Sequence, residues 1–428
     1  MAPKTHGIEG VAYRSKHIQE GDMRTANQNV FAFYLPTKVV HGPNSIVETG
    51  TEFKGLGATK ALVVTDKGVK GAGLLEGVFE SLKKSGIPYV VFDEVEEDPG
   101  GVTVGKGAEI AIKEKCDGII VVGGGSPICA GRGIGVVVTN GGMIKQYAGL
   151  NKASKPPLPL IAIPTTAGSG AEVSQFILLK DEELHTKMVV GSPMYFPKVA
   201  ILDPMLLRGL PFWQAVVSGI DAISHAIEAY CTTMTTPLTD SWALQAVNMI
   251  YQNLRPAATS DDLDAKEACL IGSAMANMAC GNSKLGLTHA MTIPAEGMFK
   301  VPHGLAIGAL LPHVMEFNLV ASPQRFVQLA KSMGELEEGR SVTELASCAI
   351  GAFKRLLADV NFPRKYSDLK VDPKAIPQMA KMIMGGLYGV YDPSKEYPLN
   401  TVVPSVNIRK ATLKNVIELY EKSFEGWE

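Results

Sequence analysis

The amino-acid sequence predicts an α/β domain with a Rossmann-like, doubly wound parallel sheet, followed by an all-α domain. Between residues 60 and 204, short and almost continuously apolar runs alternate with amphipathic stretches, as buried parallel strands alternate with crossover helices. After Pro211 the pattern becomes helical almost throughout. The chain has 428 residues, of which 46% are hydrophobic, so it is long enough for two domains and can bury a large core.

The expected strands and helices of the first part follow a polar extension. Residues 1–28 are poor in large apolar side chains, and we expect them to be mobile or to dock on a partner. The core should begin at Phe31, where FAFYLPTKVV has the composition of a strand. Parallel strands are expected at 60–66, 88–95, 118–126, 158–166 and 198–204. Amphipathic stretches at 73–86 and 103–116 predict crossover helices.

The second part begins near Leu210-Pro211, because proline suits the first turn of a helix. Helical patterns then continue to the C-terminus. We therefore expect an extension over 1–28, an α/β domain over 29–207 and a helical domain over 208–428.

Charge and composition exclude several classes of protein. The 41 Lys and Arg against 43 Asp and Glu give a net charge of −2, without the basic excess of a nucleic-acid binder. No apolar run reaches the roughly 18 residues of a membrane helix, and the N-terminus lacks the apolar segment of a secretory signal. The cysteines are scattered and form no CxxC pair, as expected for reduced thiols in the cytoplasm: Cys116, Cys129, Cys231, Cys269, Cys280 and Cys348.

A glycine-rich loop follows the expected strand GIIVV. It consists of Gly123, Gly124, Gly125 and Ser126, and an apolar helical stretch comes directly after it. Glycines let the backbone approach a ligand closely, and the next helix offers free N–H groups to an anion. A pyrophosphate is the natural ligand, and a tight strand-to-helix turn is the alternative.

Polar side chains also follow two other strands. Asp66 ends the first strand and could accept hydrogen bonds from a ribose diol, or could simply cap the next helix. The loop PTTAGSGAE places the hydroxyl groups of Thr165, Thr166 and Ser169 after a later strand. These hydroxyls could hold phosphate, ribose or a nicotinamide amide, and ordinary loop chemistry is the alternative.

Four side chains of the helical part favour a divalent metal. Asp221 and His225 are four residues apart in GIDAISHAIEAY, so on a helix they share one face. His289 and His303 lie in apolar, glycine-flanked surroundings further along the chain. One carboxylate and three imidazoles suit Fe²⁺ or Zn²⁺.

The sequence between and around these histidines limits the arrangement. Pro294 and Pro302 should break any continuous helix, so His289 and His303 should come from separate segments. Each histidine taken alone could instead be structural. His313 fits a helix end, and we expect it to be structural. The remaining histidines have the surroundings of surface or loop residues: His6, His17, His41 and His185.

Taken together and in order, these blocks resemble the iron-containing, metal-dependent (group III) alcohol dehydrogenases. The resemblance runs from about Phe31 to the C-terminus and includes VVTDKG, VVGGGSPI, IPTTAGSGAEVSQF, GIDAISHAIEAY and GLTHAM…VPHGLAIGALLPHVMEFN. It implies a dehydroquinate synthase-like two-domain architecture, with an N-terminal NAD-binding domain, a C-terminal all-helical domain and catalysis in the cleft between them.

The resemblance also implies roles for individual residues. Fe²⁺, or Zn²⁺ or another divalent metal, would be bound by Asp221, His225, His289 and His303. The glycine loop would cradle the NAD pyrophosphate, and Lys187 would lie near the cofactor. Asp66 would favour NAD over NADP. The cofactor would further be lined by Thr165, Thr166 and Ser169.

Several positions depart from the family pattern. GGGSxxDxxK reads GGGSPICAGR, so Cys129 replaces Asp and Arg132 replaces Lys. Asp98 stands where Asn often meets the adenosine side. Ile293 replaces a histidine that many members carry four residues after the first ligand of this segment, so that histidine's proton relay is absent. The extension 1–28 and the late segment 390–409 are longer than in compact members.

The function implied is reversible hydride transfer between NAD(H) and a small primary alcohol or its aldehyde, with the metal polarising the substrate oxygen. A short polar or anionic aldehyde such as sulfoacetaldehyde is one candidate substrate. The alternatives are a hydroxyacid–oxoacid transhydrogenase that retains NAD, a dehydroquinate-synthase-like lyase, whose usual Glu-His-His metal set argues against it, and an inert binding protein. We expect a cytoplasmic homodimer or larger homo-oligomer without nucleic-acid or membrane partners.

Overall fold

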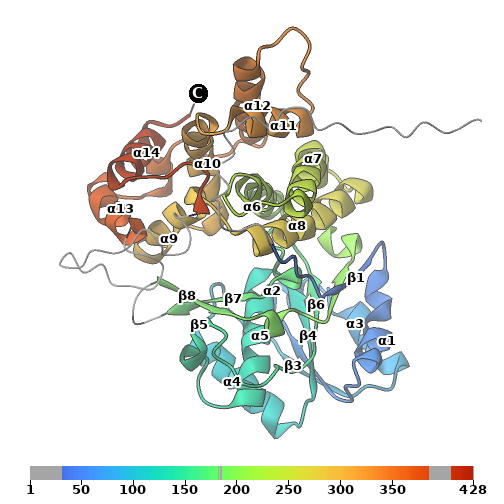
Figure 1. Cartoon of the computed structure of the whole chain (residues 1–428). Helices are drawn as coiled ribbons and strands as arrows, with labels where there is room; N and C mark the ends of the chain where they lie inside the picture. The colour runs from blue at the N-terminus through green and yellow to red at the C-terminus, as the bar shows by residue number, and fades with distance from the viewer. Residues whose placement is uncertain (1–30, 182, 184–185, 385–405, 428) are drawn as a thin grey trace, which may run out of the picture. The chain divides into compact units, whose positions relative to one another are not determined.

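The computed structural model in Figure 1 describes residues 31–181, 183, 186–384 and 406–427. From Ala32 onward the chain forms one compact unit. The expectations for the extension 1–28 and for most of the segment 390–409 lie outside the described residues. Within the described ranges, no helix combines the length and apolar character needed to cross a membrane.

A six-stranded parallel sheet is the centre of the first part, in the order β1-β9-β6-β4-β2-β3. This sheet confirms the predicted α/β fold, and every expected parallel run contains a strand, although each strand is shorter than its run. The strands are β1 (Lys38–His41), β2 (Ala61–Val64), β3 (Tyr89–Phe92), β4 (Gly118–Gly123), β6 (Leu160–Pro164) and β9 (Val199–Leu202).

The strand expected from Phe31 begins only at Lys38, so the prediction for residues 31–37 is wrong. Lys38–His41 pairs with the full length of β9, whereas the preceding residues take no part in the ladder. Pro36 lies in that preceding stretch and has no N–H to donate to a neighbouring strand.

Helices cover both faces of the sheet. Side chains of each central strand alternate between two separate apolar clusters: Val63 and Ile120 belong to one, and Leu62 and Ile119 to the other. This two-sided burial explains why the strands read as continuous apolar runs. The helices of this part are α1 (Thr49–Gly55), α2 (Lys67–Gly71), α3 (Glu76–Lys84), α4 (Gly101–Lys113) and α5 (Gly125–Asn140).

A second, three-stranded sheet was not expected from the sequence. Its order is β5-β8-β7, with β5 at Gly149–Leu150, β7 at Phe176–Asp181 and β8 at Thr186–Gly191. β7 and β8 are antiparallel, and Lys180 pairs with Lys187 across them. This hairpin carries Lys187, so it positions a predicted cofactor residue.

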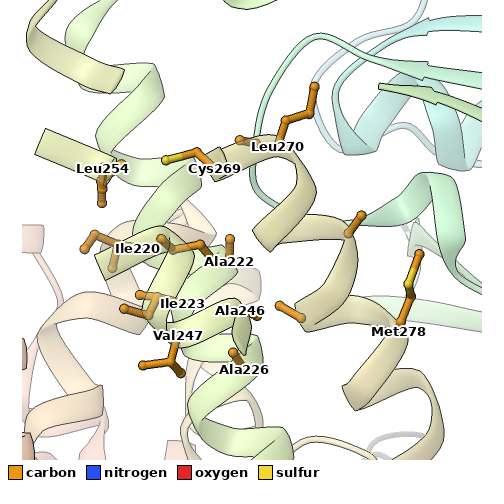
Figure 2. Close-up of a cluster of buried hydrophobic side chains, with 14 of the residues drawn as sticks. Ile220, Ala222, Ile223, Ala226, Ala246, Val247, Leu254, Cys269, Leu270 and Met278 are labelled. Atoms are coloured by element: carbon orange, nitrogen blue, oxygen red, sulfur yellow. The ribbon is translucent and has the colours of Figure 1, made fainter. Parts of the chain in front are cut away.

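The second part is helical, as predicted. α6, α7 and α8 pack together through Ile223 of α6, Val247 of α7 and Leu270 of α8, and Figure 2 shows these side chains in one cluster. The helices are α6 (Phe212–Tyr230), α7 (Pro237–Thr259), α8 (Leu263–Ser283), α9 (Leu287–Phe299), α10 (His303–Leu319), α11 (Pro323–Ser332), α12 (Val342–Asp359), α13 (Ile376–Met384) and α14 (Leu413–Glu425).

Single turns of 3₁₀ helix connect these elements. They are η1 (Ser45–Glu48), η2 (Ile144–Tyr147), η3 (Ala171–Val173), η4 (Pro193–Tyr195), η5 (Pro204–Leu207), η6 (Tyr366–Leu369) and η7 (Pro373–Ala375).

His289 and His303 lie on separate helices, as expected, but Pro294 does not separate them. Pro294 is inside α9, so the prediction that it breaks the helix is wrong. The break lies later, where Lys300 adopts a left-handed conformation with φ 55° and Pro302 precedes the first residue of α10.

Candidate metal and cofactor site

Four predicted metal ligands converge on one carboxylate oxygen. Asp221 and His225 come from α6, His289 from α9, and His303 is the first residue of α10. The Oδ1 atom of Asp221 lies 3.8 Å from Nε2 of His225, 3.8 Å from Nε2 of His289 and 3.4 Å from Nε2 of His303. Asp221, His289 and His303 form the tightest group, with ligand atoms within 4.8 Å of one another. His225 joins this group through Asp221.

The donor atoms of this cluster fit a divalent metal. Asp221 Oδ1 and His289 Nε2 are buried and have no hydrogen-bond partner in the described structure. Buried polar atoms without partners are costly, and a shared cation would satisfy both. A carboxylate with imidazole nitrogens is also a donor set that Fe²⁺ and Zn²⁺ accept.

Two glutamates with buried side chains hold the outer nitrogens of two of the three histidines, and the sequence interpretation missed both. Glu228 Oε2 lies 2.6 Å from Nδ1 of His289. The same carboxylate accepts N–H bonds from Gly286 and Thr288 at the start of α9. Glu296 contacts Nδ1 of His303 in the same way. Such contacts orient an imidazole and leave its other nitrogen free for a metal.

A helical-face argument could have found these glutamates. Glu228 lies seven residues after Asp221 on α6, and Glu296 lies seven residues after His289 on α9. Two turns of helix bring a side chain back to nearly the same face.

The charges in the cluster suit a cation. Burial opposes ionisation of Asp221, but His225 and His303 hold its pKa well below the usual range. Burial lowers the pKa of His225 to about 4. This imidazole is therefore charged only in the acid range where Asp221 titrates, and near pH 7 it is neutral and free to bind a metal. Burial also disfavours the charged form of His303, yet Glu296 and Asp221 raise its pKa to about 10. His303 therefore has to release a proton before its Nε2 can bind a metal.

The predicted cofactor residues gather at one edge of the six-stranded sheet. β2, β4 and β6 are neighbours and parallel, so their carboxyl ends meet there. Asp66 follows β2, Gly123 ends β4, and Thr165 follows β6. In chain order, β3 is added on one side of β2, and β4 and the later strands are added on the other side. Open α/β sheets bind ligands where the order switches sides in this way, which here is between β2 and β4.

The glycine loop and the hydroxyl loop touch each other. A Cβ atom on Gly124 would lie 3.2 Å from Oγ1 of Thr166, and one on Gly125 would lie 3.0 Å from Oγ of Ser169. The backbone N–H of Thr165 donates to the carbonyl of Gly123. The loops therefore form one surface beside the first turn of α5, whose N–H groups are available to an anion.

Asp66 caps α2, which is one of the two roles considered for it. Its carboxylate accepts the N–H of Val69 at 2.8 Å. Its part in cofactor choice stays a prediction. Ser126 lies on the first turn of α5, and its Oγ accepts the N–H of Asp98 at 3.3 Å.

The positions that depart from the family pattern have definite surroundings. Cys129 and Arg132 are buried in α5, and the Arg132 guanidinium donates to the carbonyls of Ser174 and Phe176, each at 2.5 Å. Arg132 therefore ties α5 to the chain that enters β7. Ile293 is half-buried on α9.

The other histidines and the cysteines lie outside the cluster. His313 is buried in α10, and burial lowers its pKa to about 4. His41 is exposed at the end of β1, with Nδ1 3.1 Å from Glu267. All six cysteines are unpaired, and only Cys348 is partly exposed. Three histidines lie outside the described residues: His6, His17 and His185.

Comparison with known proteins gives consistent matches over nearly the whole chain. Residues 36–204 match the family model described as iron-containing alcohol dehydrogenase, and residues 215–424 match the C-terminal model of the same family. The 1,3-propanediol dehydrogenase of Citrobacter freundii is 38% identical over 400 residues, which cover 92% of this chain and 99% of that protein. The NAD-dependent methanol dehydrogenase of Bacillus methanolicus is 37% identical over 350 residues, covering 82% of this chain and 92% of that protein. A crystal structure of 1,3-propanediol oxidoreductase superimposes with a TM-score of 0.86 at 36% identity, covering 92% of this chain and 100% of that chain.

Proposed function

The chain belongs to the iron-containing alcohol dehydrogenase family, and from this premise we propose that it transfers hydride reversibly between NAD(H) and a small primary alcohol or its aldehyde. The family uses NAD(H) and iron, and its members are oxidoreductases that act on alcohols. The observation that carries the proposal is the convergence of three imidazole Nε2 atoms on Asp221 Oδ1.

In this proposal Asp221, His225, His289 and His303 hold the metal. Glu228 accepts the Nδ1–H of His289 and so keeps the Nε2 lone pair directed at the cluster. The ionised Asp221 offsets part of the metal charge in a buried site. When bound, the metal supplies a Lewis acid for the substrate oxygen, while the nicotinamide carries the hydride.

The cofactor is proposed to lie along the joined glycine and hydroxyl loops. The glycine loop, made of Gly123, Gly124, Gly125 and Ser126, offers backbone N–H groups to the pyrophosphate. Thr165, Thr166 and Ser169 offer hydroxyl groups nearby. Lys187 is proposed to contact the cofactor. Asp66 is proposed to accept a hydrogen bond from a ribose hydroxyl and to repel a 2′-phosphate.

The substrate is proposed to be a short alcohol or aldehyde. The similar proteins above are named for 1,3-propanediol and methanol, which supports a small substrate. A short polar or anionic aldehyde such as sulfoacetaldehyde stays within this class. A reductase named for sulfoacetaldehyde is among the similar structures, but at 24% identity it supports the fold alone.

A screen of NADH oxidation over C2–C4 aldehydes, with metal analysis of the same sample, tests the proposal. We expect net NADH consumption with at least one aldehyde and a divalent metal in the active sample. Retained NAD with hydride exchange between two substrates, but no net NADH signal, would instead identify a transhydrogenase. Absence of both signals from a metal-loaded sample would contradict the proposal.

A further inference from the structure

Glu296 lies between a predicted metal ligand and a predicted cofactor residue, and neither the sequence motifs nor the proposed function gives it a role. It is on α9, and its side chain is 6% exposed. Its Oε1 contacts Nδ1 of His303 on α10, and its Oε2 lies 2.6 Å from Nζ of Lys187 on β8. A single carboxylate therefore joins three elements.

These contacts extend to the glycine loop. Nζ of Lys187 also lies 3.5 Å from Oδ1 of Asp98, whose N–H donates to Oγ of Ser126. Charges alternate along this path, from the Glu296 carboxylate to the Lys187 ammonium and the Asp98 carboxylate. The path links the metal cluster to the proposed pyrophosphate loop.

We propose that Glu296 is a positioning residue that orients His303 toward the metal and offsets the charge of Lys187 beside it. This inference rests on the proposed function, because it takes Asp221, His289 and His303 as metal ligands.

The orienting part of the argument follows from the two nitrogens of His303. With Nδ1 held by Glu296, Nε2 faces Asp221 Oδ1 at 3.4 Å. The His303 side chain is 32% exposed, whereas those of His225 and His289 are each 9% exposed. His303 is thus the least enclosed imidazole of the cluster, so packing restrains it least and its carboxylate contact matters most.

The charge-offsetting part follows from the burial of the pair. The Lys187 side chain is only 20% exposed, and Glu296 is its closest charged partner. If Glu296 were neutral, Lys187 would place a poorly screened ammonium close to the metal ligands. That ammonium would repel a divalent cation, because Coulomb forces act strongly where water is scarce.

A double-variant comparison separates this role from a merely structural one. Glu296→Gln keeps the shape and an acceptor atom but removes the charge, so we expect the affinity for Zn²⁺ to fall by about tenfold or more. Lys187→Met added to that variant removes the unpaired cation, so the double variant should bind Zn²⁺ more tightly than Glu296→Gln alone. If the pair only stabilised the fold, the second substitution would leave the affinity unchanged or weaken it further.

The experiment measures Zn²⁺ affinity of the metal-free full-length chain by competition with a chromophoric chelator, without cofactor or substrate. Glu316→Gln is the matched control, since Glu316 lies on α10 with His303 and pairs with Lys354 at 3.0 Å on the surface. We expect this control to bind like the wild type. The inference is overturned if Glu296→Gln also binds like the wild type, or if Lys187→Met fails to restore affinity.

Two further variants keep the result unambiguous. If Glu296→Gln does not fold, Glu296→Asp replaces it: a carboxylate drawn back by one methylene should weaken Zn²⁺ binding, and wild-type affinity would overturn the inference. His289→Ala tests the site itself. Wild-type Zn²⁺ affinity in His289→Ala would refute the proposed metal site, whereas a failure confined to the Glu296 variants would refute only the positioning role.

Discussion

Asp66 combines a structural contact with a proposed role in cofactor choice. It caps α2 by accepting the N–H of Val69. Replacing such a cap by glycine costs only about 0.3 kcal/mol. We therefore expect Asp66→Gly to fold and to narrow the preference for NADH over NADPH, because the charge that repels a 2′-phosphate is gone. The ratio of kcat/KM for the two cofactors measures this.

A second cap provides the control for Asp66. Asp262 caps α8 by accepting the N–H of Ala265 at 3.0 Å. Asp262→Gly removes a similar contact away from the cofactor edge, and it should leave the cofactor preference unchanged. If the wild type had the same kcat/KM for NADPH as for NADH, the role assigned to Asp66 would be wrong.

Ile293 stands where many relatives have a histidine, and an aliphatic side chain cannot carry protons. Outside the metal cluster, the described part of the chain has only His41, which is exposed, and His313, which is buried. We therefore expect alcohol oxidation by the wild type to rise with pH into the alkaline range, and Ile293→His to add an inflection near neutral pH. Steady-state profiles of the oxidation rate against pH test this expectation. It would be contradicted if the wild-type profile had an inflection near neutral pH that disappeared when His41 or His313 was replaced.

Glu172 makes stability depend on pH. It is 2% exposed in η3, and burial raises its pKa from 4.5 to about 7, against the opposing charge of Arg132. Because the pKa is raised in the folded state, protonated Glu172 contributes to the free energy of unfolding. This contribution is fully present below pH 4.5 and is lost as pH rises through about 7. At pH 8, Glu172→Gln should therefore increase the free energy of unfolding by up to about 3 kcal/mol.

Denaturant titrations at pH 5 and pH 8 measure the effect of Glu172→Gln. The gain should be larger at pH 8, while the exposed control Glu316→Gln should change little at either pH. If Glu172→Gln were less stable than the wild type at pH 8, the ionised Glu172 carboxylate would stabilise the fold, which would contradict this prediction.

At the scale of elements, the contact between the glycine loop and the hydroxyl loop decides how the cofactor is held. In Gly125→Ala, the new Cβ would lie 3.0 Å from Ser169 Oγ and 3.3 Å from its Cβ, so the Ser169 side chain and its loop must shift by a few tenths of an ångström. Overpacking of this kind costs about 1 kcal/mol or more, which corresponds to roughly a fivefold or greater rise in KM for NADH. We expect kcat to change less.

Gly105→Ala is the matched control for this loop variant. Gly105 lies inside α4, and a Cβ there would meet nothing within 4 Å. KM for NADH should be the same as in the wild type. An unchanged KM in Gly125→Ala as well would mean that the cofactor does not use the joined loops.

Elements differ in how far the sequence predicts them. The parallel strands were predictable because burial on both faces produces continuous apolar runs, as in Gly118–Gly123. The β7–β8 hairpin was missed because its partly buried strands lack that signature and interrupt the strand–helix alternation. Pro294 was misread because a proline inside α9 removes one N–H without ending the helix.

The site was predictable only in part, for a related reason. Local spacing places Asp221 and His225 on one face of α6, but which side chains face them depends on how α9 and α10 pack. Glu228 and Glu296 therefore escaped notice, since their significance arises from contacts across helices. The catalytic and cofactor roles of the residues brought together here stay predictions until variants are measured.

At the scale of the whole molecule, the proposed reaction needs the helical part and the sheet to act together. The metal cluster lies on α6, α9 and α10, and the proposed cofactor surface lies at the ends of β4 and β6. One apolar cluster contains residues from both sides of position 207, including Leu206 and Ile220. The domain boundary at 207/208 and a homodimer or larger homo-oligomer stay predictions, which limited proteolysis and light scattering would test.

The most direct test of the central claim compares His289→Ala with His313→Ala for metal content and NADH-dependent aldehyde reduction. His289 faces Asp221, whereas His313 is a buried histidine of α10 outside the cluster. We predict that His289→Ala loses turnover and most of its metal, because one of four ligands is gone, while His313→Ala keeps wild-type metal stoichiometry. Full metal content and activity in His289→Ala would contradict the account.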